Sequence, residues 1–582
     1  MTKFLALILF VTTYYGVRAQ GDYKVHSHND YQHEYPFWNA YVSGATSIEV
    51  DIFLKNGDLY VAHETHEIAA KKTLETLYLE KLKGLMHSEN LREIQLLIDI
   101  KSEAYSTLDK LIALLEKYPM LLKSGKVRFV ISGNRPKLAD YKNYPDYILF
   151  DHQNLNDLGT SYLEKVALIS LSFKDFSVWN GYGRIVEPEL ITVKKAIQKA
   201  HNFKKPFRFW DTPDTKTAWA RFSQLGVDYI NTDKPEQVSP YLEKLDTNSL
   251  ENTVTIDTYV PKHKHNSENH PTNIILMVGD GNGLGQITAA MIANKGQLTI
   301  LGIKDIGLVK TAAYDDLITD SAAGDTAIAT GFKTNNRAIG VGPDGKALKN
   351  ILEYTRDKGF NTGIITTDDI FGATPASFYA HRIERNNTEG ILEDLNNSSL
   401  AFFITSGKRE GLTTSNKFVT QELEAFESFK QPTAVYLKEN QDGKGLSKSV
   451  KKALQVLSAK KEPFFLMVEG AKIDNGGHAN NINMIVEEMF DFDLAIAEAL
   501  RFSDASKNTL VIITADHETS GLGIVGGEEA KGIIRGDFLS LDHTGIMVPL
   551  FAYGPMADRF TGTYENTEIY WKILSVLGWR TK

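Results

Sequence analysis

Eight short apolar segments of β character alternate with amphipathic helical stretches between residues 22 and 240. The segments are YKVHS, SIEVDIFL, LLIDIK, VRFVIS, YILF, LISLSF, PFRFW and DYINTD. Eight strands that alternate with helices are typical of a (β/α)8 TIM barrel, and the length of the region agrees with that fold. A further strand-like run, DLYVAHE, follows the second segment and fits a hairpin at a strand end.

A second α/β pattern begins at Asn273. Its β segments are NIILMVGD, NTGIITT, PFFLMVEG, NTLVIITAD and VPLFAYG, each apolar on both faces, as expected for a sheet covered by helices. The residues between the two patterns, 241–271, are polar and rich in Asn, Lys and His, and we interpret them as a linker. We therefore expect an α/β chain with a barrel at 21–240 and an α/β/α sandwich at 272–582.

The N-terminal residues 1–20 combine Lys3, the apolar run FLALILFVTTYYGV and the ending VRA. This pattern predicts a secretory signal peptide and a periplasmic or secreted protein. No other stretch reaches the roughly 20 apolar residues of a membrane span. The chain has no cysteine, so its stability must come from its core and from metals rather than from disulfides. A net charge of −9 gives no reason to expect nucleic acid as a partner.

Residue types that bind metals follow the β segments of the second region. In open α/β sheets, ligands bind beyond the carboxyl ends of the strands, which is where these residues fall. Two of them are four apart in VEGAKIDNGGH and share one face of a helix. Carboxylates and imidazoles together suit zinc and magnesium. The residues are Asp280, Glu469, Asp474, His478, Asp516, His517 and His543.

The motif TDSAAGDTAIATG, residues 319–331, supplies a candidate nucleophile. Ser321 begins a helical run, where the helix dipole and backbone N–H groups favour an anion. The motif contains no histidine to act as a base, so we expect a metal to activate the serine; a simple N-cap role is the alternative. The motif ATPASFYAHRIER adds Thr374 and Arg385. An arginine fork matches two phosphate oxygens, with a surface ion pair as the alternative.

Taken in order, DSAAGDTAIATG, ATPASFYAHRIER, VEGAKIDNGGH, ADHE and HTG resemble the alkaline phosphatase family over residues 272–582. The resemblance implies that Ser321 is the phosphorylated nucleophile and that Arg385 grips the phosphate. It also implies two zinc ions and one magnesium ion. The first zinc would bind Asp474, His478 and His543, the second Asp280, Asp516 and His517, and the magnesium Asp280, Thr374 and Glu469. Gly372, two residues before Thr374, stands where family members often carry Asp or His, so a side chain near the metals is missing.

The barrel carries a second set of chemical groups near the C-terminal ends of its strands, where barrel enzymes place their active sites. Glu49 and Asp51 lie two apart on one strand, and Asp99 and Lys101 lie two apart on another. The two members of each pair therefore point to the same side of their strand. Together the set offers two histidines, three carboxylates, a lysine and an amide. The residues are His28, Asn29, Glu49, Asp51, His63, Asp99 and Lys101.

This barrel set resembles the phosphatidylinositol phospholipase C and glycerophosphodiester phosphodiesterase superfamily over residues 22–240. The resemblance implies that His28 and His63 are general base and acid, and that a calcium or magnesium ion binds Asn29, Glu49, Asp51 and Asp99. Glycerophosphodiesterases usually show His-Arg and then His-Asp, where this chain has His28-Asn29 and His63-Glu64, and Asp99 stands where Glu is usual. Expected substrate contacts, with structural roles as the alternative, are Lys101, Arg208 and Trp210.

Together, the two sites predict an exported bifunctional phosphoesterase. The barrel would cleave a phosphodiester, such as a glycerophosphodiester, to a monoester, from which the second domain would release inorganic phosphate. The expected partners are small phosphate esters, and a homodimer is compatible with the sequence. Two alternatives remain open: a phosphomonoesterase with a barrel that binds a ligand without cleaving it, and a sulfatase or diesterase in the second domain.

Overall fold

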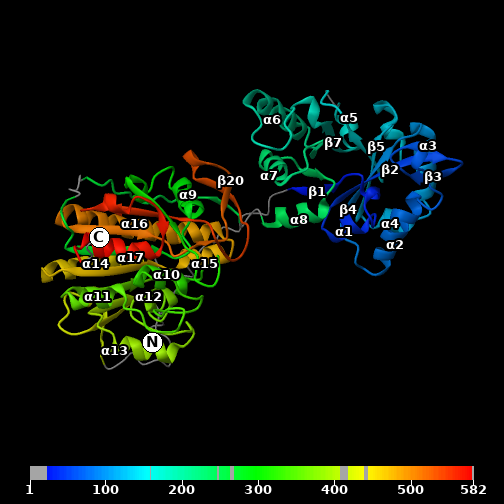
Figure 1. Cartoon of the computed structure of the whole chain (residues 1–582). Helices are drawn as coiled ribbons and strands as arrows, with labels where there is room; N and C mark the ends of the chain where they lie inside the picture. The colour runs from blue at the N-terminus through cyan, green and yellow to red at the C-terminus, as the bar shows by residue number, and fades with distance from the viewer. Residues whose placement is uncertain are drawn as a thin grey trace, which may run out of the picture. The chain divides into compact units, whose positions relative to one another are not determined.

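The computed structural model describes residues 23–156, 159–244, 248–262, 268–406, 417–437 and 443–579. The predicted signal peptide lies outside the described residues. The chain divides into two compact units, residues 1–246 and 247–582, and each is described by itself (Figure 1). None of the described helices is long and apolar enough to cross a membrane.

Unit 1 is a closed barrel of eight parallel strands within the described residues. Strand β1 pairs with both β2 and β9, which closes the ring, and the hairpin strand β3 (Asp58–Val61) runs antiparallel to β2. All eight predicted segments form barrel strands, so the predicted fold class is confirmed. The strands are β1 (Lys24–Ser27), β2 (Ser47–Lys55), β4 (Ile94–Ile100), β5 (Val127–Gly133), β6 (Ile148–His152), β7 (Val166–Ser172), β8 (Phe207–Trp210) and β9 (Tyr229–Thr232).

The helices of unit 1 cover the outside of the barrel and leave a small interior. The large apolar cluster of the unit joins the strands to these helices, while a separate small cluster unites Leu97, Val130, Leu168 and Tyr229 from four strands. Because side chains alternate along a strand, Asp99 lies on the same side of β4 as Leu97, one layer nearer the C-terminal end. The helices are α1 (Trp38–Val42), α2 (Glu80–His87), α3 (Ala104–Leu115), α4 (Pro119–Lys123), α5 (Thr160–Leu163), α6 (Glu187–Asn202), α7 (Lys216–Leu225) and α8 (Pro235–Lys244).

Unit 2 is built on a sheet that has ten strands in the part of the chain the structure describes. The order is β15-β16-β14-β13-β17-β11-β18-β23-β12-β24, with β23 antiparallel to both of its neighbours. The five predicted segments form the central strands β11, β13, β17 and β18 and the strand β23 beside them. The strands are β11 (Asn273–Gly279), β12 (Asp305–Lys310), β13 (Asn361–Thr366), β14 (Phe402–Thr405), β15 (Val419–Glu422), β16 (Thr433–Tyr436), β17 (Phe464–Gly470), β18 (Thr509–Thr514), β23 (Val548–Tyr553) and β24 (Gly562–Glu565).

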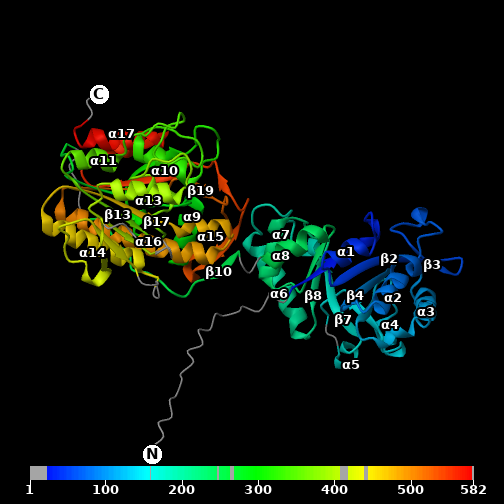
Figure 2. The ribbon, with the colours of Figure 1, turned by 90° about the horizontal axis from the view of Figure 1, so that it is seen from below.

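Helices cover both faces of this sheet, which makes the unit an α/β/α sandwich (Figure 2). One apolar cluster joins the sheet to α9, α14, α15 and α16, and a second joins its other face to α10, α11, α12, α13 and α17. The bounds are α9 (Leu284–Ala293), α10 (Ser321–Thr330), α11 (Ile351–Asp357), α12 (Ala373–Ala376), α13 (Thr388–Asn397), α14 (Gly445–Lys460), α15 (Lys472–His478), α16 (Ile482–Ser506) and α17 (Thr567–Val576).

The segment 241–271, interpreted from the sequence as a linker, also contains regular structure. Strand β10 (Ser249–Glu251) pairs with β21 (Ile533–Asp537), which in turn pairs with β20 (Gly523–Glu528) in a separate small sheet. Further along, the Tyr259 hydroxyl donates a hydrogen bond to Asp504 on α16 at 2.6 Å. This part of the segment therefore packs on unit 2. A two-stranded pairing of β19 (Glu518–Thr519) with β22 (His543–Thr544) completes the unit.

Candidate active sites

The register of the central sheet in unit 2 brings three carboxylates to one edge. Val278 on β11 pairs with Glu469 on β17 and with Thr514 on β18. Asp280 comes two residues after Val278, and Asp516 comes two residues after Thr514. The two aspartates therefore occupy equivalent places beyond neighbouring parallel strands. All three carboxyl groups are buried, and burial without a partner disfavours the ionised form.

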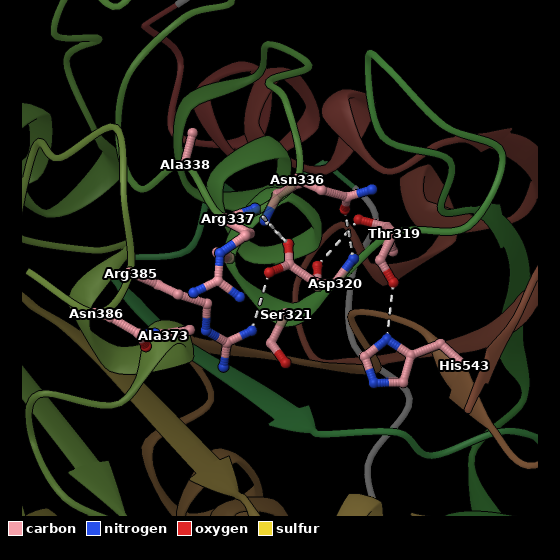
Figure 3. Close-up of polar contacts among 12 residues, drawn as sticks. Thr319, Asp320, Ser321, Asn336, Arg337, Ala338, Ala373, Arg385, Asn386 and His543 are labelled. Atoms are coloured by element: carbon pink, nitrogen blue, oxygen red, sulfur yellow. Dashed lines mark hydrogen bonds and ion pairs between the residues drawn. The ribbon is translucent and has the colours of Figure 1, made fainter. Parts of the chain in front are cut away.

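Ser321 is the first residue of α10, on the same side of the molecule as these carboxylates. Its Oγ lies 3.4 Å from Nε2 of His517. The preceding residue, Asp320, caps the helix by accepting a hydrogen bond from the Ala323 N–H, and its other oxygen accepts one from Arg385 at 3.0 Å. Figure 3 shows the Arg385 side chain held beside Asp320 and Ser321 in this way. A hydroxyl, a helix N-terminus and a guanidinium thus meet at one point, as an anion requires.

The first predicted zinc set is assembled around Asp474 on α15. Its carboxylate lies 3.2 Å from His478 Nε2 and 3.7 Å from His543 Nε2. In both histidines Nδ1 lies against a backbone carbonyl, that of Leu541 or Thr319, so Nδ1 carries the proton. The two Nε2 atoms face each other at 3.2 Å beside the Asp474 carboxylate, an arrangement that a shared cation stabilises. The chemistry of this donor set therefore fits a zinc ion.

The second predicted zinc set lies beneath Ser321. His517 Nε2 is 3.1 Å from an Asp516 oxygen and 3.5 Å from an Asp280 oxygen. Burial and the charge of Asp474 raise the pKa of Asp516 to about 6, and burial lowers the pKa of His517 to about 3. One oxygen each of Asp280 and Asp516 is buried without a hydrogen-bond partner among the described residues. A neutral imidazole beside such oxygens fits a second cation.

The predicted magnesium set adds Thr374, from α12, and Glu469 to Asp280. The Thr374 hydroxyl is also buried without a hydrogen-bond partner in the described part of the chain. Burial raises the pKa of Glu469 to about 8, although the Thr366 hydroxyl donates a hydrogen bond to it. An oxygen-only set of this kind fits magnesium. Gly372 caps α12 and has no side chain to contribute here.

The barrel places the first predicted histidine, His28, beside Asp233, which follows the neighbouring strand β9. His28 Nδ1 lies 2.8 Å from Asp233, which follows β9, and Nε2 lies 4.0 Å from Glu49. Burial acts to lower the pKa of His28, but the hydrogen bond to Asp233 and the charge of Glu49 raise it overall. Asp233 thus orients the ring and favours the imidazolium form.

The second predicted histidine, His63, is joined to the same end of the barrel by Tyr31. The Tyr31 hydroxyl donates to Asp51 at 2.8 Å and contacts Asn29 Oδ1 at 3.1 Å and His63 Nδ1 at 3.0 Å. Asn29 has a left-handed backbone, with φ of 45°, which asparagine tolerates better than most residues. The Tyr31 hydroxyl therefore links Asn29, in the loop after β1, to Asp51 and His63.

Three carboxylates of the barrel form a compact oxygen cluster. One oxygen from each of Glu49, Asp51 and Asp99 lies within 4.8 Å of the others. Lys101 Nζ lies 3.1 Å from Asp51 and 3.2 Å from Asp99. Burial and the charge of Glu49 nevertheless raise the pKa of Asp99 to about 7. The cluster fits a hard divalent cation, and Lys101 supplies part of the positive charge directly.

The surroundings of Arg208 favour the structural role that was the alternative to a substrate contact. Its side chain is buried inside the barrel, with Nη1 2.7 Å from Glu49 Oε2 and 3.1 Å from Asn231 Oδ1. Its guanidinium thus already pairs with the Glu49 carboxylate and with polar side chains around it. Trp210, at the end of β8, is 38% exposed, and its substrate role stays a prediction.

A cavity of about 810 Å³ opens beside Lys101 at the C-terminal end of the barrel strands. Its lining is mostly polar and includes Asn134, Arg135, His152 and Gln153. Arg135 donates to Gln153 at 3.0 Å, and Asn134 donates to the Ser102 carbonyl at 2.9 Å. The cavity is therefore walled by ordered hydrogen-bonding groups next to the carboxylate cluster.

Sequence reasoning did not identify several residues that these sites use. Asp233 follows a barrel strand, so the strand-end rule that selected His28 would also have found it. Asp320 lies in a motif quoted above and Tyr31 lies three residues after His28, but the contacts of both depend on folding. His26, within the first barrel strand, has its Nε2 2.8 Å from Glu49.

Comparison with protein families divides the chain in the same way. Residues 271–401 and 412–534 match the family described as alkaline phosphatase. Residues 18–99 match an AIM6-like phosphodiesterase domain, and residues 206–236 match the glycerophosphoryl diester phosphodiesterase family. Apart from His543, which follows residue 534, the matched parts contain the metal-type clusters of both units.

Individual relatives match the second unit. Alkaline phosphatase 4 of Bacillus subtilis is 30% identical, over 52% of this chain and 88% of the relative. The alkaline phosphatase of Escherichia coli K12 is 27% identical, over 54% and 87%. The solved alkaline phosphatase of the Antarctic bacterium TAB5 is 37% identical, covers 54% of this chain and 99% of its own, and has a TM-score of 0.50. A mutant of that enzyme was solved with Mg bound in the M3 site.

The interior ion pair predicts that Arg208→Met destabilises the barrel. Removal of the guanidinium leaves Glu49 buried beside a neutral side chain, which costs about 3–5 kcal/mol. Urea unfolding of the full chain, followed by circular dichroism, measures this loss. Trp210→Ala, an exposed change on the same strand, should alter stability by about 0.5 kcal/mol or less. Equal stability of Arg208→Met and the wild type would contradict the proposed structural role.

Proposed function

Because this chain belongs to the alkaline phosphatase family, we propose that it is a bifunctional phosphoesterase that hydrolyses a phosphodiester in its barrel and a phosphomonoester in its second unit. Phosphomonoester hydrolysis follows from the family. The predicted fusion of an alkaline phosphatase domain to a phosphodiesterase-like barrel is confirmed. The observation that carries the proposal is that each unit has its own cluster of acid–base and cation-binding groups beyond parallel strands.

In the second unit, the Ser321 hydroxyl is the proposed nucleophile. Its oxygen forms a bond to phosphorus while the ester bond breaks and the alcohol leaves with a proton. Water then attacks the phosphoserine, inorganic phosphate is released, and Ser321 regains its proton. Arg385, held by Asp320, orients two phosphate oxygens, and the N-terminus of α10 offers further N–H donors.

The ligand sets support the proposed cofactors, two zinc ions and one magnesium ion. The first zinc would be held by Asp474, His478 and His543, the second by Asp280, Asp516 and His517, and the magnesium by Asp280, Thr374 and Glu469. When bound, these cations would stabilise negative charge on the phosphate and on the attacking and leaving oxygens. The mutant alkaline phosphatase of TAB5 with Mg bound supports magnesium here.

In the barrel, His28 and His63 are the proposed general base and acid. One takes a proton from the attacking water, and the other gives a proton to the departing alcohol as the phosphodiester bond breaks. Asp233 and Tyr31 orient the two rings. Calcium or magnesium, held by Asn29, Glu49, Asp51 and Asp99, would offset charge on the phosphate. The polar cavity beside Lys101 suits a hydrophilic alcohol group, such as that of a glycerophosphodiester.

One observation favours a second candidate, a barrel that binds a ligand without cleaving it. The Lys101 ammonium already pairs with Asp51 and Asp99, so the cluster is partly neutralised without a divalent cation. In that case the second unit alone would be the enzyme.

We also propose that the chain is exported to the periplasm or secreted. The support is the signal-type sequence of residues 1–20. The homodimer stays a prediction, which sedimentation velocity tests.

Ser321→Ala should reduce phosphate release from monoesters by at least about 10³-fold, because the atom that bonds phosphorus is removed. Cleavage of diesters to monoesters should be unchanged. Mass spectrometry after an acid quench should find phosphoserine at Ser321 in the wild type. The matched control is Ser503→Ala, a buried serine on α16 that hydrogen-bonds Thr509. Retained monoesterase activity in Ser321→Ala would refute the assignment.

The double variant His28→Ala with His63→Ala should lower diester cleavage by at least about 10²-fold, because both proton-transfer groups are lost. Monoester hydrolysis should persist. The assay is conversion of glycerophosphocholine to free phosphate, with His201→Ala as a control histidine that pairs with Asp228. Wild-type turnover of the diester by the double variant would rule out the two-step reaction.

A further inference from the structure

Asp325 is a buried carboxylate that none of the steps above uses. It lies on α10 one helical turn after Ser321, directly after Ala322, Ala323 and Gly324, and its exposed fraction is 0%. Neither of its carboxylate oxygens has a hydrogen-bond partner among the described residues. A buried carboxylate is strongly unfavourable, so this side chain requires more than the neighbouring Thr374 hydroxyl, and a cation would meet that requirement.

The backbone around Asp325 packs directly on the metal-type cluster of unit 2. A Cβ atom placed on Gly324 would lie 3.0 Å from the Asp516 carbonyl oxygen and 3.2 Å from its Cβ, so α10 approaches Asp516 closely at a residue that lacks a side chain. This approach brings Asp325 within electrostatic range of Asp516 and Glu469 and beside the Thr374 hydroxyl. Burial and the charge of Asp516 raise the pKa of Asp325 well above its usual value.

The unsatisfied oxygens of this region belong to one group of residues. Asp280 Oδ1, Thr374 Oγ1 and both Asp325 oxygens are all buried without a hydrogen-bond partner within the described ranges. Asp280 and Asp325 also interact electrostatically, so the four atoms belong to neighbouring side chains. The Thr374 hydroxyl is the one donor among these four atoms, and a set dominated by carboxylate oxygens is what a hard divalent cation binds.

The opposite side of the pocket explains why an additional carboxylate fits. Gly372, which begins the turn that presents Thr374, contributes no side chain. A Cβ there would lie 3.0 Å from the Asp369 carbonyl oxygen and 3.3 Å from an Asp368 carboxylate oxygen, so the space is narrow and its edge is already acidic. Gly372 thus adds no ligand to the pocket, whereas α10 adds the buried Asp325 carboxylate.

We propose that Asp325 is a ligand-set residue of the magnesium pocket formed by Asp280, Thr374 and Glu469. The inference rests on the proposed function, because it assigns a residue to a cofactor of that site. Asp325 acts on the reaction through the cation and is a positioning residue. A third carboxylate in this oxygen-only set strengthens the preference of the pocket for magnesium.

The test is the affinity of the full-length protein for magnesium. Asp325→Asn keeps the shape of the side chain and removes its charge. The zinc-loaded variant, titrated with magnesium and analysed by mass spectrometry of bound metal, should bind magnesium at least about tenfold more weakly than the wild type. Its zinc content should equal that of the wild type. The rise in Tm that magnesium gives the wild type should shrink accordingly.

The matched control is Asp493→Asn, which neutralises another fully buried carboxylate of unit 2 that accepts hydrogen bonds from the Thr299 and Ile300 N–H groups. It should leave magnesium affinity unchanged. Asp325→Ala removes the carboxylate and its polar replacement, and serves where Asp325→Asn does not fold. Wild-type magnesium affinity in either folded Asp325 variant overturns the inference, since a structural, protonated Asp325 predicts that result.

Failure of this inference is distinguishable from failure of the proposed function. Phosphoserine at Ser321 in the wild type, with magnesium affinity unaffected in Asp325→Asn, overturns the role of Asp325 alone. Absence of phosphoserine in the zinc- and magnesium-loaded wild type overturns the proposed function of the second unit as well.

Discussion

The mutual repulsion of buried carboxylates is the constraint on which unit 2 depends. Parallel strands in register deliver Asp280, Glu469 and Asp516 to one edge, and α10 adds Asp325 from the side. Burial and neighbouring charges raise the pKa of each of the four, so the ionised cluster is stable with divalent cations and unstable without them. Ser321, the proposed nucleophile, lies beside this cluster, with its Oγ 3.4 Å from His517 Nε2. The same charges that disfavour the metal-free site would favour the binding of the proposed cations.

The barrel meets the same constraint with side chains. Arg208 is buried beneath Glu49, and Lys101 lies between Asp51 and Asp99. This internal neutralisation lets the barrel keep three carboxylates close together at a lower demand for bound metal. It also pairs Lys101 and Arg208 with carboxylates, so neither charge is fully available to a substrate phosphate. The two units therefore place similar residue types under different electrostatic conditions.

Much of this structure could be predicted from local sequence pattern. The eight barrel strands and the central strands of the sandwich are short apolar runs between helices, so periodicity locates them. The strands that were missed, such as β14, β16 and β24, are four residues long, and pairing with distant neighbours rather than local pattern defines them. The candidate ligand residues could be proposed because their motifs are specific. The partners of those residues were not: Arg208 reaches Glu49 across 159 positions, and nothing local signals that contact.

Asp325 shows why a motif alone is incomplete. It stands inside the quoted run that contains Ser321, and as a sequence letter it reads as an ordinary helical residue. Only its burial, together with the lack of a partner among the described residues, distinguishes it. Sequence specifies residue types and spacing, while the energetic need of each side chain depends on what folding places around it.

The central claim is that one chain carries two successive phosphoester hydrolyses. Phosphorus NMR of the metal-loaded wild-type protein with a glycerophosphodiester follows diester, monoester and inorganic phosphate together. The account predicts that the monoester signal rises first and then decays as inorganic phosphate accumulates. A diester signal that stays constant, under conditions in which the same sample hydrolyses an added monoester, would contradict it.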